Sequence, residues 1–305
     1  MEDAIRLAIA VPTVGHDKWL GVVSKILPDQ QPGFDLIDFI AVLENYDSDE
    51  DPIKLGSVIF SNYNHVPVHV ISYSCALGSA GAYSALLSHC EYHEVDWVLC
   101  LDDDSSLPDH SFVSEALTAL ERMDRDVAVL SCSSTSGVLY SGWALYDKVR
   151  VHRRLSSSDI PPSNTLVEID MAPWSGMFVR VSVLGSVRPR DDFFFSHEDY
   201  DFCLRIRKKN LRVVGNPCLR TSHDKGDADL SAWRVYYDTR NEVLLARRHL
   251  TGISLVLSMI RSLIRVFLYK KRNFRTAFKG FFHGVFGVSG RTVGFDSSPS
   301  RGFDR

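Results

Sequence analysis

The run VDWVLCLDDD, residues 95–104, joins a short apolar segment to three consecutive acids. Its apolar part, residues 97–101, has the length and composition of a strand buried on both faces, as in a parallel sheet. Because alternate side chains of an extended chain point the same way, the carboxylates of Asp102 and Asp104 should converge and that of Asp103 should point away. Converging carboxylates repel one another unless a cation lies between them, and Mg²⁺ and Mn²⁺ prefer such ligands. The alternative is a solvated acidic turn that caps the next helix.

Strands and helices are expected to alternate on either side of this run. We predict strands at residues 5–13, 34–43, 66–72 and 127–132, and helices at residues 18–27, 78–87 and 111–122. Such alternation indicates an α/β fold with a mostly parallel sheet flanked by helices through right-handed crossovers. Ligands of these sheets bind beyond the carboxyl ends of the strands. Thr13, the polar run 44–51 and the acids 102–104 all follow strands and should meet at that edge.

The composition is that of an ordinary globular protein. With 305 residues, of which 45% are hydrophobic and 24% charged, the chain can form one large domain or one domain with an appendage. A net charge of -4 argues against a dedicated nucleic-acid binder. The six cysteines form no CxxC pair and lie mostly in apolar runs, which indicates buried thiols in a reducing compartment. The acidic N-terminus shows no secretory signal and no apolar stretch is long enough to span a membrane, so we expect a cytoplasmic protein.

A second informative run is DDFFFSHEDYDFCLR, residues 191–205. A helix should begin at Ser196, with that residue as N-cap and Asp199 as a capping-box acid. Acids are favoured at a helix N-terminus in any case, and Asp201 and Arg205 have the i,i+4 spacing of an ion pair. Taken alone, this run is as readily structural as functional.

Residues 211–215 and 218–222 are predicted to form two short strands that end at His223. The order of motifs is then strand-Thr, strand-Glu-Asn-x-Asp, a Gly-x-x-Gly turn, strand-Asp-Asp-Asp, Ser-Gly-Met, Phe-Phe-x-x-Glu-Asp-x-Asp-x-x-x-Arg, and His. This ordered set resembles the family 2 glycosyltransferases of the GT-A fold, nearest the bacterial rhamnosyltransferases and galactofuranosyltransferases. The resemblance covers roughly residues 5–250 and implies a Rossmann-like nucleotide-diphospho-sugar transferase sheet.

The resemblance assigns roles residue by residue. It implies that a divalent ion, Mn²⁺ or Mg²⁺, is held by Asp102, Asp104 and His223. It implies nucleotide contacts from Thr13, Glu44, Asn45, Asp102 and Asp103. Asp199 matches the catalytic base, and its neighbour Glu198 would bind a hydroxyl of the acceptor or donor. The residues that it places near the acceptor and donor sugars are Trp174, Ser175, Gly176, Asp201 and Arg205.

The implied reaction moves a sugar, galactofuranose or rhamnose, from a UDP- or dTDP-sugar to a hydroxyl of a glycan or a polyprenyl-linked saccharide in cell-envelope polysaccharide synthesis. The departing diphosphate carries charge that a metal ion would neutralise as a Lewis acid. The acceptor hydroxyl is a weak nucleophile and needs a base within hydrogen-bond reach, which Asp199 can be. One base without a carboxylate nucleophile predicts direct displacement with inversion at the anomeric carbon.

The carboxyl-terminal region has a different character. Beyond Arg247, Lys and Arg dominate, and residues 253–269 are strongly apolar apart from a narrow polar stripe at helical spacing. The stripe consists of Ser254, Ser258, Arg261 and Arg265. This pattern predicts a helix that lies in a membrane interface, with the basic residues 270–272, Arg275 and Lys279 meeting anionic headgroups. The alternative is a helix packed on the catalytic domain with a basic solvent face.

We therefore predict a catalytic domain at residues 1–235, a helical, membrane-associating region at 236–295 and a disordered tail at 296–305. The enzyme should be peripheral on the inner face of the cell membrane, and a homo-oligomer is considered. A sugar nucleotidyltransferase is a second interpretation, but its Gly-rich basic phosphate loop would be reduced here to Gly15 and Lys18. An inactive membrane-bound scaffold of the same fold is a third, and the joint presence of all the candidate catalytic and metal residues argues against it.

Overall fold

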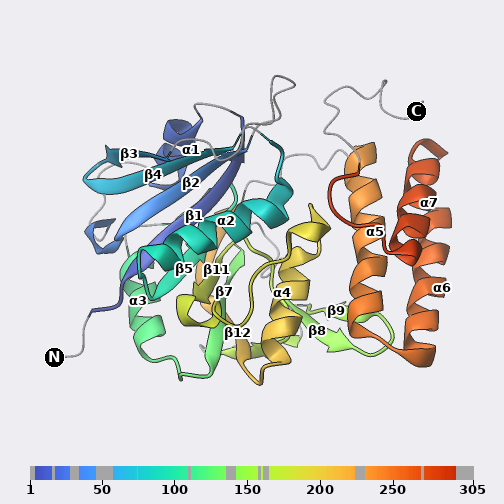
Figure 1. Cartoon of the computed structure of the whole chain (residues 1–305). Coiled ribbons are helices and arrows are strands. Elements are labelled where there is room, and N and C mark those ends of the chain that lie inside the picture. Colours follow the sequence, from blue (N-terminus) through green and yellow to red (C-terminus); the bar gives the residue numbers. More distant parts are fainter. Residues whose placement is uncertain are drawn as a thin grey trace.

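The computed structural model of the chain describes residues 4–15, 18–27, 34–45, 58–73, 75–108, 111–134, 142–156, 159–160, 165–223, 231–268 and 271–292. Its core is a sheet in the order β10-β12-β7-β11-β5-β1-β2-β4-β3, with β6 paired to β12 (Figure 1). The central strands are parallel and are β1 (Leu7–Val14), β2 (Phe39–Asn45), β4 (Val66–Tyr73) and β5 (Trp97–Cys100). The α/β fold expected from the alternation of strands and helices is confirmed.

Antiparallel strands complete the sheet on both sides. The strand β3 (Val58–Tyr63) pairs with β4, and β11 (Met177–Arg180) lies between β5 and β7 (Val127–Ser134). Beyond them, β12 (Arg212–His223) runs parallel to β7 and pairs with β10 (Val167–Ile169) and β6 (Ser105–Ser106). The two strands predicted around Asn216-Pro217 are thus one strand, which shifts register between Asn216 and Arg220.

Helices cover both faces of the sheet, which explains why its central parallel strands are mainly apolar. Along β1, Leu7, Ile9 and Val11 pack with α1 (Trp19–Ile26) and α3 (Phe112–Glu121), while the alternate residues pack with α2 (Gly78–Tyr92) and α4 (Glu198–Arg207). The strand predicted at 34–43 begins only at Phe39, because the residues before it form the 3-10 turn η1 (Phe34–Leu36).

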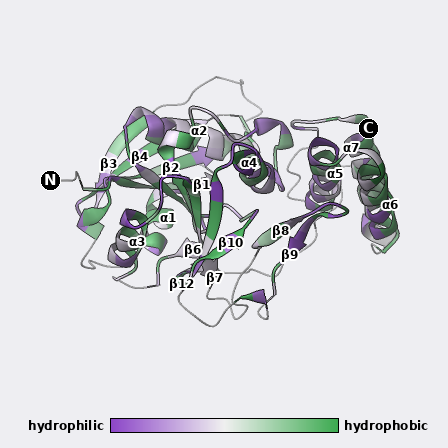
Figure 2. Cartoon of the chain, turned by 90° about the horizontal axis from the view of Figure 1, so that it is seen from below, coloured by the Kyte–Doolittle hydropathy of each residue, from purple (hydrophilic) through white to green (hydrophobic). Residues whose placement is uncertain are grey.

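Three helices stand together beside the sheet, near the hairpin of β8 (Ala144–Asp147) and β9 (Val151–Arg154) (Figures 1 and 2). They are α5 (Ala232–His249), α6 (Gly252–Leu268) and α7 (Lys271–Phe286). The predicted domain boundary at 235–236 falls inside α5, and the predicted tail at 296–305 lies outside the described residues. Among the helices of the described ranges, none combines the length and apolar character needed to cross a bilayer.

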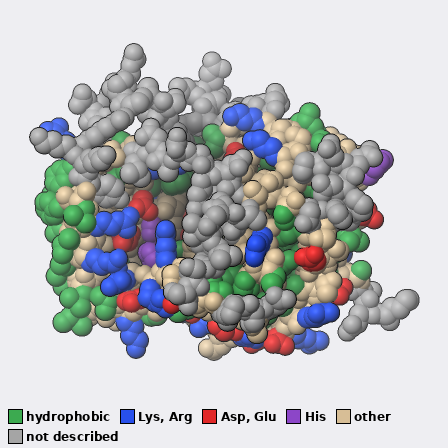
Figure 3. All heavy atoms as spheres, turned by 180° about the vertical axis from the view of Figure 1, so that it is seen from behind, with side chains coloured by type: hydrophobic (Ala, Val, Ile, Leu, Met, Phe, Trp, Pro, Cys, Tyr) green, Lys and Arg blue, Asp and Glu red, His purple; other side chains and the backbone are tan. Residues whose placement is uncertain are grey.

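The helix α6 turns its polar side inward and its apolar side outward. Ser258 and Ser262 are buried, and Arg265 forms ion pairs with Asp238 and Glu242 of α5. The apolar residues of its outer side are 43% to 79% exposed and are Ile253, Val256, Leu257, Ile260, Ile264, Phe267 and Leu268. Seen from behind, hydrophobic side chains gather along the edge that α6 forms (Figure 3). The helix packs on α5, as the alternative interpretation expected, but its outer side is mainly apolar rather than basic.

Candidate active site

A pocket of about 580 Å³ lies at the carboxyl edge of the parallel strands. Its volume is within the range of sites for small ligands. It is lined by Pro12, Thr13, Val14, Asn45, Gly78, Ser79, Asp102, Asp103, Asp104, Phe195, Trp233 and Arg234. These residues come together because β1 lies between β2 and β5, so that three strands end side by side. Thr13, Asn45 and the acids 102–104 therefore meet at one site, as the sequence predicts.

The three acids lie in a turn rather than in an extended strand. The strand β5 ends at Cys100, and the Ser105 N–H donates to the carbonyl of Asp102 at 3.0 Å. Tyr83 Oη donates to Asp102 Oδ1 at 3.0 Å, and Thr13 Oγ1 donates to Asp103 Oδ2 at 2.7 Å. All three acids line the pocket. The prediction that Asp103 points away is wrong, because the alternation of an extended chain does not apply to a turn.

The acid run suits a hard divalent cation. Three carboxylates in one pocket supply the oxygen ligands that Mn²⁺ and Mg²⁺ prefer. The charge of Asp102 also helps to raise the pKa values of Glu198 and Asp199, so a cation here would relieve repulsion among several acids. The third predicted ligand, His223, has its backbone paired with Ser105, directly after the acids, and its side chain lies outside the described part of the chain.

Glu44 and Asn45 hold the chain segments that border the pocket. Glu44 Oε1 accepts hydrogen bonds from the backbone N–H groups of Lys18 and Trp19, at 2.7 and 3.0 Å, where α1 begins. Glu44 is buried and caps that helix, so the structure does not place it against the pocket. Asn45 Oδ1 accepts from the Leu77 N–H at 2.9 Å, which ties the end of β2 to the start of α2.

The start of α2 contacts the loop before α4 closely. Gly78 has a φ of +67°, and a Cβ there would lie 2.0 Å from the carbonyl oxygen of Phe194. Only glycine fits this conformation and this approach. The next residue, Ser79, donates a hydrogen bond from its hydroxyl to Glu198 Oε1. The glycine turn therefore links Glu198 to the pocket through Ser79, while Glu198 and Asp199 themselves are not among the lining residues.

The loop before α4 has an unusual backbone that α5 stabilises. Phe194, Ser196 and His197 have φ values of 65°, 70° and 70°. Arg240 Nη2 donates to the Phe193 carbonyl at 2.6 Å, and Asn241 Nδ2 donates to the carbonyls of Phe193 and Ser196, each at 2.9 Å. Because both side chains are fully buried, these bonds fix the loop firmly.

The helix α4 starts one residue later than predicted. It begins at Glu198, and His197 occupies the N-cap position in the left-handed conformation without a side-chain cap. The prediction of Ser196 as N-cap is wrong, because the loop held by α5 places that residue outside the helix. Its hydroxyl instead contacts His197 Nδ1 at 2.9 Å and donates to Asp238 at 3.4 Å.

The two acids at the start of α4 have raised pKa values. Burial raises the pKa of Glu198 to about 7, against the hydrogen bond from Ser79. Burial also raises the pKa of Asp199 well above its ordinary value, and the charge of Glu198 adds to this effect. A carboxylate with a raised pKa is a stronger base than an exposed one. Asp199 accepts a hydrogen bond from the Tyr200 N–H at 2.7 Å and keeps part of its surface accessible.

Residues 174–176 support the pocket from behind. The Trp174 indole stacks on Tyr83, with ring centroids 4.7 Å apart, and Tyr83 holds Asp102. The Ser175 and Ser105 hydroxyls lie 3.0 Å apart. Gly176 has a φ of +82° and donates its N–H to the Cys100 carbonyl at 2.9 Å.

Asp201 and Arg205 lie away from the pocket lining. Arg205 Nε donates to Asp201 Oδ2 at 2.7 Å, which confirms the predicted i,i+4 pair. His249 Nε2 lies 2.9 Å from the other oxygen of Asp201. Although burial opposes it, the bonds from His249 and Arg205 lower the pKa of Asp201. Their role at a sugar remains a prediction, and their contacts are those of a buried cluster that joins α4 to α5.

Sequence reasoning missed several residues of the site. Ser79 and Phe195 line the pocket without having been given a role. Arg234 also lines it, in a run that was expected on the acceptor side, and places an exposed cation near the acids. Tyr83 donates a hydrogen bond to Asp102. In the sequence it stood out only because residues 78–83 read GSAGAY, whereas the resembled family has Gly-x-Ala-Gly-Gly-x-Asn. Arg240 and Asn241 belong to the run 233–242, which resembles the Tyr-Tyr-x-x-Arg-Asn segment of the same branch of glycosyltransferases and was expected to line the acceptor side. Their hydrogen bonds to the loop before α4 follow from no local pattern.

Comparison with known proteins identifies the family. The family model described as "Glycosyl transferase family group 2" matches residues 97–292, more than half of the chain. The chain belongs to this family. No curated protein sequence matches it significantly.

Solved structures show the fold. GalNAc-T7, in a crystal structure with UDP, GalNAc and Mn²⁺, superposes with a TM-score of 0.55 at 10% sequence identity. The match covers 81% of this chain and 48% of that one, so the chain spans about half the length of that protein. This similarity shows the GT-A fold. A197 from STIV matches over 73% of this chain and 87% of its own, with 15% identity and a TM-score of 0.38, which carries no argument.

Proposed function

We propose that this chain is an inverting, metal-dependent glycosyltransferase that moves a sugar from a nucleotide diphosphate donor to a hydroxyl of a glycan or lipid-linked acceptor. One observation carries the proposal. Three strand ends bring Thr13, Asn45 and the acids 102–104 into a single pocket, and Ser79 in its wall binds Glu198. Membership of the glycosyltransferase family supports the class of reaction.

The donor occupies this pocket in our proposal. Thr13, Asn45 and Asp103 lie where a nucleoside would be held, and UDP or dTDP is the expected nucleotide. Asp102 and Asp104, with His223, would hold Mn²⁺ or Mg²⁺, which neutralises the charge of the departing diphosphate when bound. Arg234 supplies a further positive charge at the mouth. GalNAc-T7, which shares the fold, was crystallised with both UDP and Mn²⁺.

Asp199 is the proposed base. Its raised pKa suits it to accept the proton of the acceptor hydroxyl as the oxygen attacks the anomeric carbon. The bond from that carbon to the diphosphate breaks on the opposite side, which inverts the configuration. Glu198, held by Ser79, is placed to bind a hydroxyl of either sugar. Galactofuranose and rhamnose are the sugars expected from the family resemblance.

The enzyme is proposed to bind the surface of an anionic membrane through α6 and α7. The outer side of α6 is apolar, and Phe278, Phe282 and Phe286 of α7 are also exposed. Exposed basic residues border these helices at Arg261, Arg275 and Lys279. Apolar side chains flanked by cations are typical of helices that lie in a membrane interface. This position would bring the pocket near a polyprenyl-linked acceptor on the inner face of the cell membrane.

Thermal unfolding with nucleotides tests the donor site. UDP or dTDP together with Mn²⁺ should raise the melting temperature of the wild type, and Asp104→Asn should lose this shift. Asp35→Asn is the matched control, because Asp35 is an exposed acid that precedes β2 and so lies at the end of that strand opposite the pocket. No shift with either nucleotide in the wild type would contradict the proposal.

Turnover tests the base and the stereochemistry. A screen of sugar nucleotides with a lipid-linked acceptor should give metal-dependent transfer with inversion, and Asp199→Asn should lower kcat by about 10²-fold or more. Full turnover by Asp199→Asn would show that Asp199 is not the base.

A further inference from the structure

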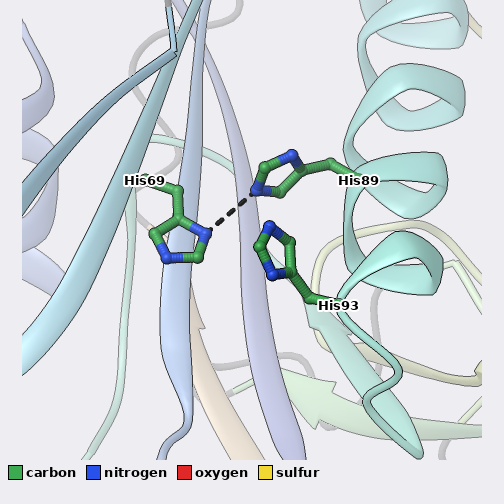
Figure 4. A group of neighbouring side chains, drawn as sticks. All are labelled: His69, His89 and His93. Carbon is green, nitrogen blue, oxygen red and sulfur yellow. Dashed lines mark hydrogen bonds between the residues drawn. The ribbon is translucent and has the colours of Figure 1, made fainter.

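Three histidines meet at the edge of the sheet, far from the pocket (Figure 4). His69 is in β4, and His89 and His93 belong to the end of α2 and the turn that follows it. One ligand atom from each ring can be chosen so that all lie within 4.8 Å of one another. Gly78 lines the pocket at the other end of α2, and at about 1.5 Å per residue it is about 16 Å from His89.

The arrangement has the features of a metal site. His89 and His93 have the i,i+4 spacing that places two ligands on one side of a helix. His69 Nδ1 and His89 Nε2 face each other at 2.9 Å. Two imidazole nitrogens bound to one tetrahedral Zn²⁺ at about 2.0–2.1 Å would be about 3.3 Å apart, so a small separation of the rings would admit the ion. His69 is buried and the other two are half-buried, so the ion can enter from solvent.

The rings are also in the right protonation state and are held in place. Burial and the neighbouring histidines lower the pKa values of His69 and His89 to about 4, so both are neutral at neutral pH and offer a lone pair. Phe39 stacks on His69 with centroids 4.2 Å apart, and Phe60 meets the same ring edge-on at 4.8 Å. These contacts fix the orientation of the ligand that belongs to the sheet.

We infer that His69, His89 and His93 bind one Zn²⁺ ion that fastens the end of α2 to β4. Three neutral nitrogen ligands favour Zn²⁺ over the Mn²⁺ and Mg²⁺ expected at the carboxylates of the pocket. The site holds the helix whose other end carries Gly78 and Ser79, and its role is therefore structural. It does not depend on the proposed transferase chemistry.

Calorimetry on protein freed of metal with a chelator tests this inference. Titration of the wild type with ZnCl₂ should show one ion bound per chain, and Zn²⁺ should raise the melting temperature. Co²⁺ in its place should give the visible absorption of a tetrahedral nitrogen site. His89 and His93 are both half-buried, so their substitution should leave the fold intact. The variants His89→Gln and His93→Gln should each weaken Zn²⁺ binding by about tenfold or more.

Two control variants separate this site from others. His65→Asn removes an exposed histidine of the neighbouring turn, where asparagine tolerates the φ of 71°, and should leave binding unchanged. Asp104→Asn disables the pocket acids and should also leave it unchanged. The inference is overturned if the wild type binds no Zn²⁺, if both histidine variants bind it as the wild type does, or if only Asp104→Asn abolishes binding.

Discussion

Glu198 and Asp199 are two adjacent acids whose pKa values are linked by their charges. The charge of Glu198 helps to raise the pKa of Asp199. Glu198→Gln removes that charge and keeps an oxygen that can accept from Ser79. The acid limb of kcat/KM should therefore shift to lower pH. A pH profile of wild type, Glu198→Gln and the exposed control Glu121→Gln measures this shift, and an unchanged limb would contradict it.

The same substitution should change the pH dependence of stability. A folded state with the pKa of Glu198 near 7 binds more protons than the unfolded chain, whose glutamates titrate at about 4.3. The stability that Glu198 contributes is therefore full below about pH 4 and is lost as the pH rises toward 7. Glu198→Gln should melt at a higher temperature than the wild type at pH 8, without divalent ions, and the advantage should fade at pH 4–5.

Gly78 is required by both its conformation and its neighbour. Gly78→Ala would force a Cβ against the Phe194 carbonyl at a positive φ, and we expect a loss of roughly 1–3 kcal/mol or more. Turnover should also fall, because Ser79 and Glu198 are displaced together. Gly21→Ala is the control, since a Cβ there meets nothing within 4 Å in a helix and should be neutral or stabilising. Thermal unfolding compares the two.

At the scale of elements, α5 acts mainly by holding the loop before α4. Asn241→Ala would remove the donor of the Ser196 carbonyl and would leave Arg240 as the remaining side-chain donor of the Phe193 carbonyl, which should cost roughly 1–3 kcal/mol in all. Because Glu198 and Asp199 follow this loop, kcat should fall more than stability alone explains. Asn62→Ala, at an exposed position of β3, is the control. Denaturant unfolding and turnover, measured together, would reject the idea if kcat stayed at the wild-type value.

The outer side of α6 can be tested without disturbing the inner one. A triple variant Ile260→Ser, Ile264→Ser and Phe267→Ser changes side chains that are 50%, 57% and 63% exposed, so the fold should be retained. Binding to vesicles that contain anionic lipid should be lost. Ile59→Ser, at 56% exposure on β3, controls for a general loss of apolar surface. Sedimentation with vesicles measures binding, and unchanged sedimentation would rule out α6 as the contact.

At the scale of the whole molecule, the sequence predicts what depends on neighbours along the chain. Apolar runs such as 97–101 identified the strands, and the rule for parallel sheets brought Thr13, Asn45 and the acids together. The predictions that were wrong concern residues whose positions depend on contacts with distant parts of the chain. Asp103 is held by Thr13, which lies 90 residues earlier, and Ser196 is displaced by a loop bound to α5. Glu44 follows a strand as a nucleotide-binding residue would, but its carboxylate accepts hydrogen bonds from backbone N–H groups at the start of α1.

The last helices are not an appendage. A Cβ at Gly280 or Gly284 of α7 would lie 2.6 Å from a backbone carbonyl of α5, so the two helices touch closely. Arg240 of α5 reaches both the Phe193 carbonyl and that of Gly290. A chain ended at residue 235, the predicted domain boundary, should therefore lose turnover entirely while the full chain retains it. A turnover assay on the purified fragment, with circular dichroism to show that it folds, decides this.

The hydrogen bonds from Arg240 and Asn241 to the loop before α4 also limit where chimeras between members of this family can be joined. Exchanging the carboxyl-terminal helices between relatives would be one way to test the membrane contact proposed for them. A crossover at residue 235 would separate the loop before α4 from Arg240 and Asn241, the two side chains that hold it. A crossover after His249 would keep these donors with their own loop and would leave the fit of the incoming α7 against α5 as the requirement to meet. In an exchange between relatives, α5 should therefore be kept together with the sheet and the loop before α4.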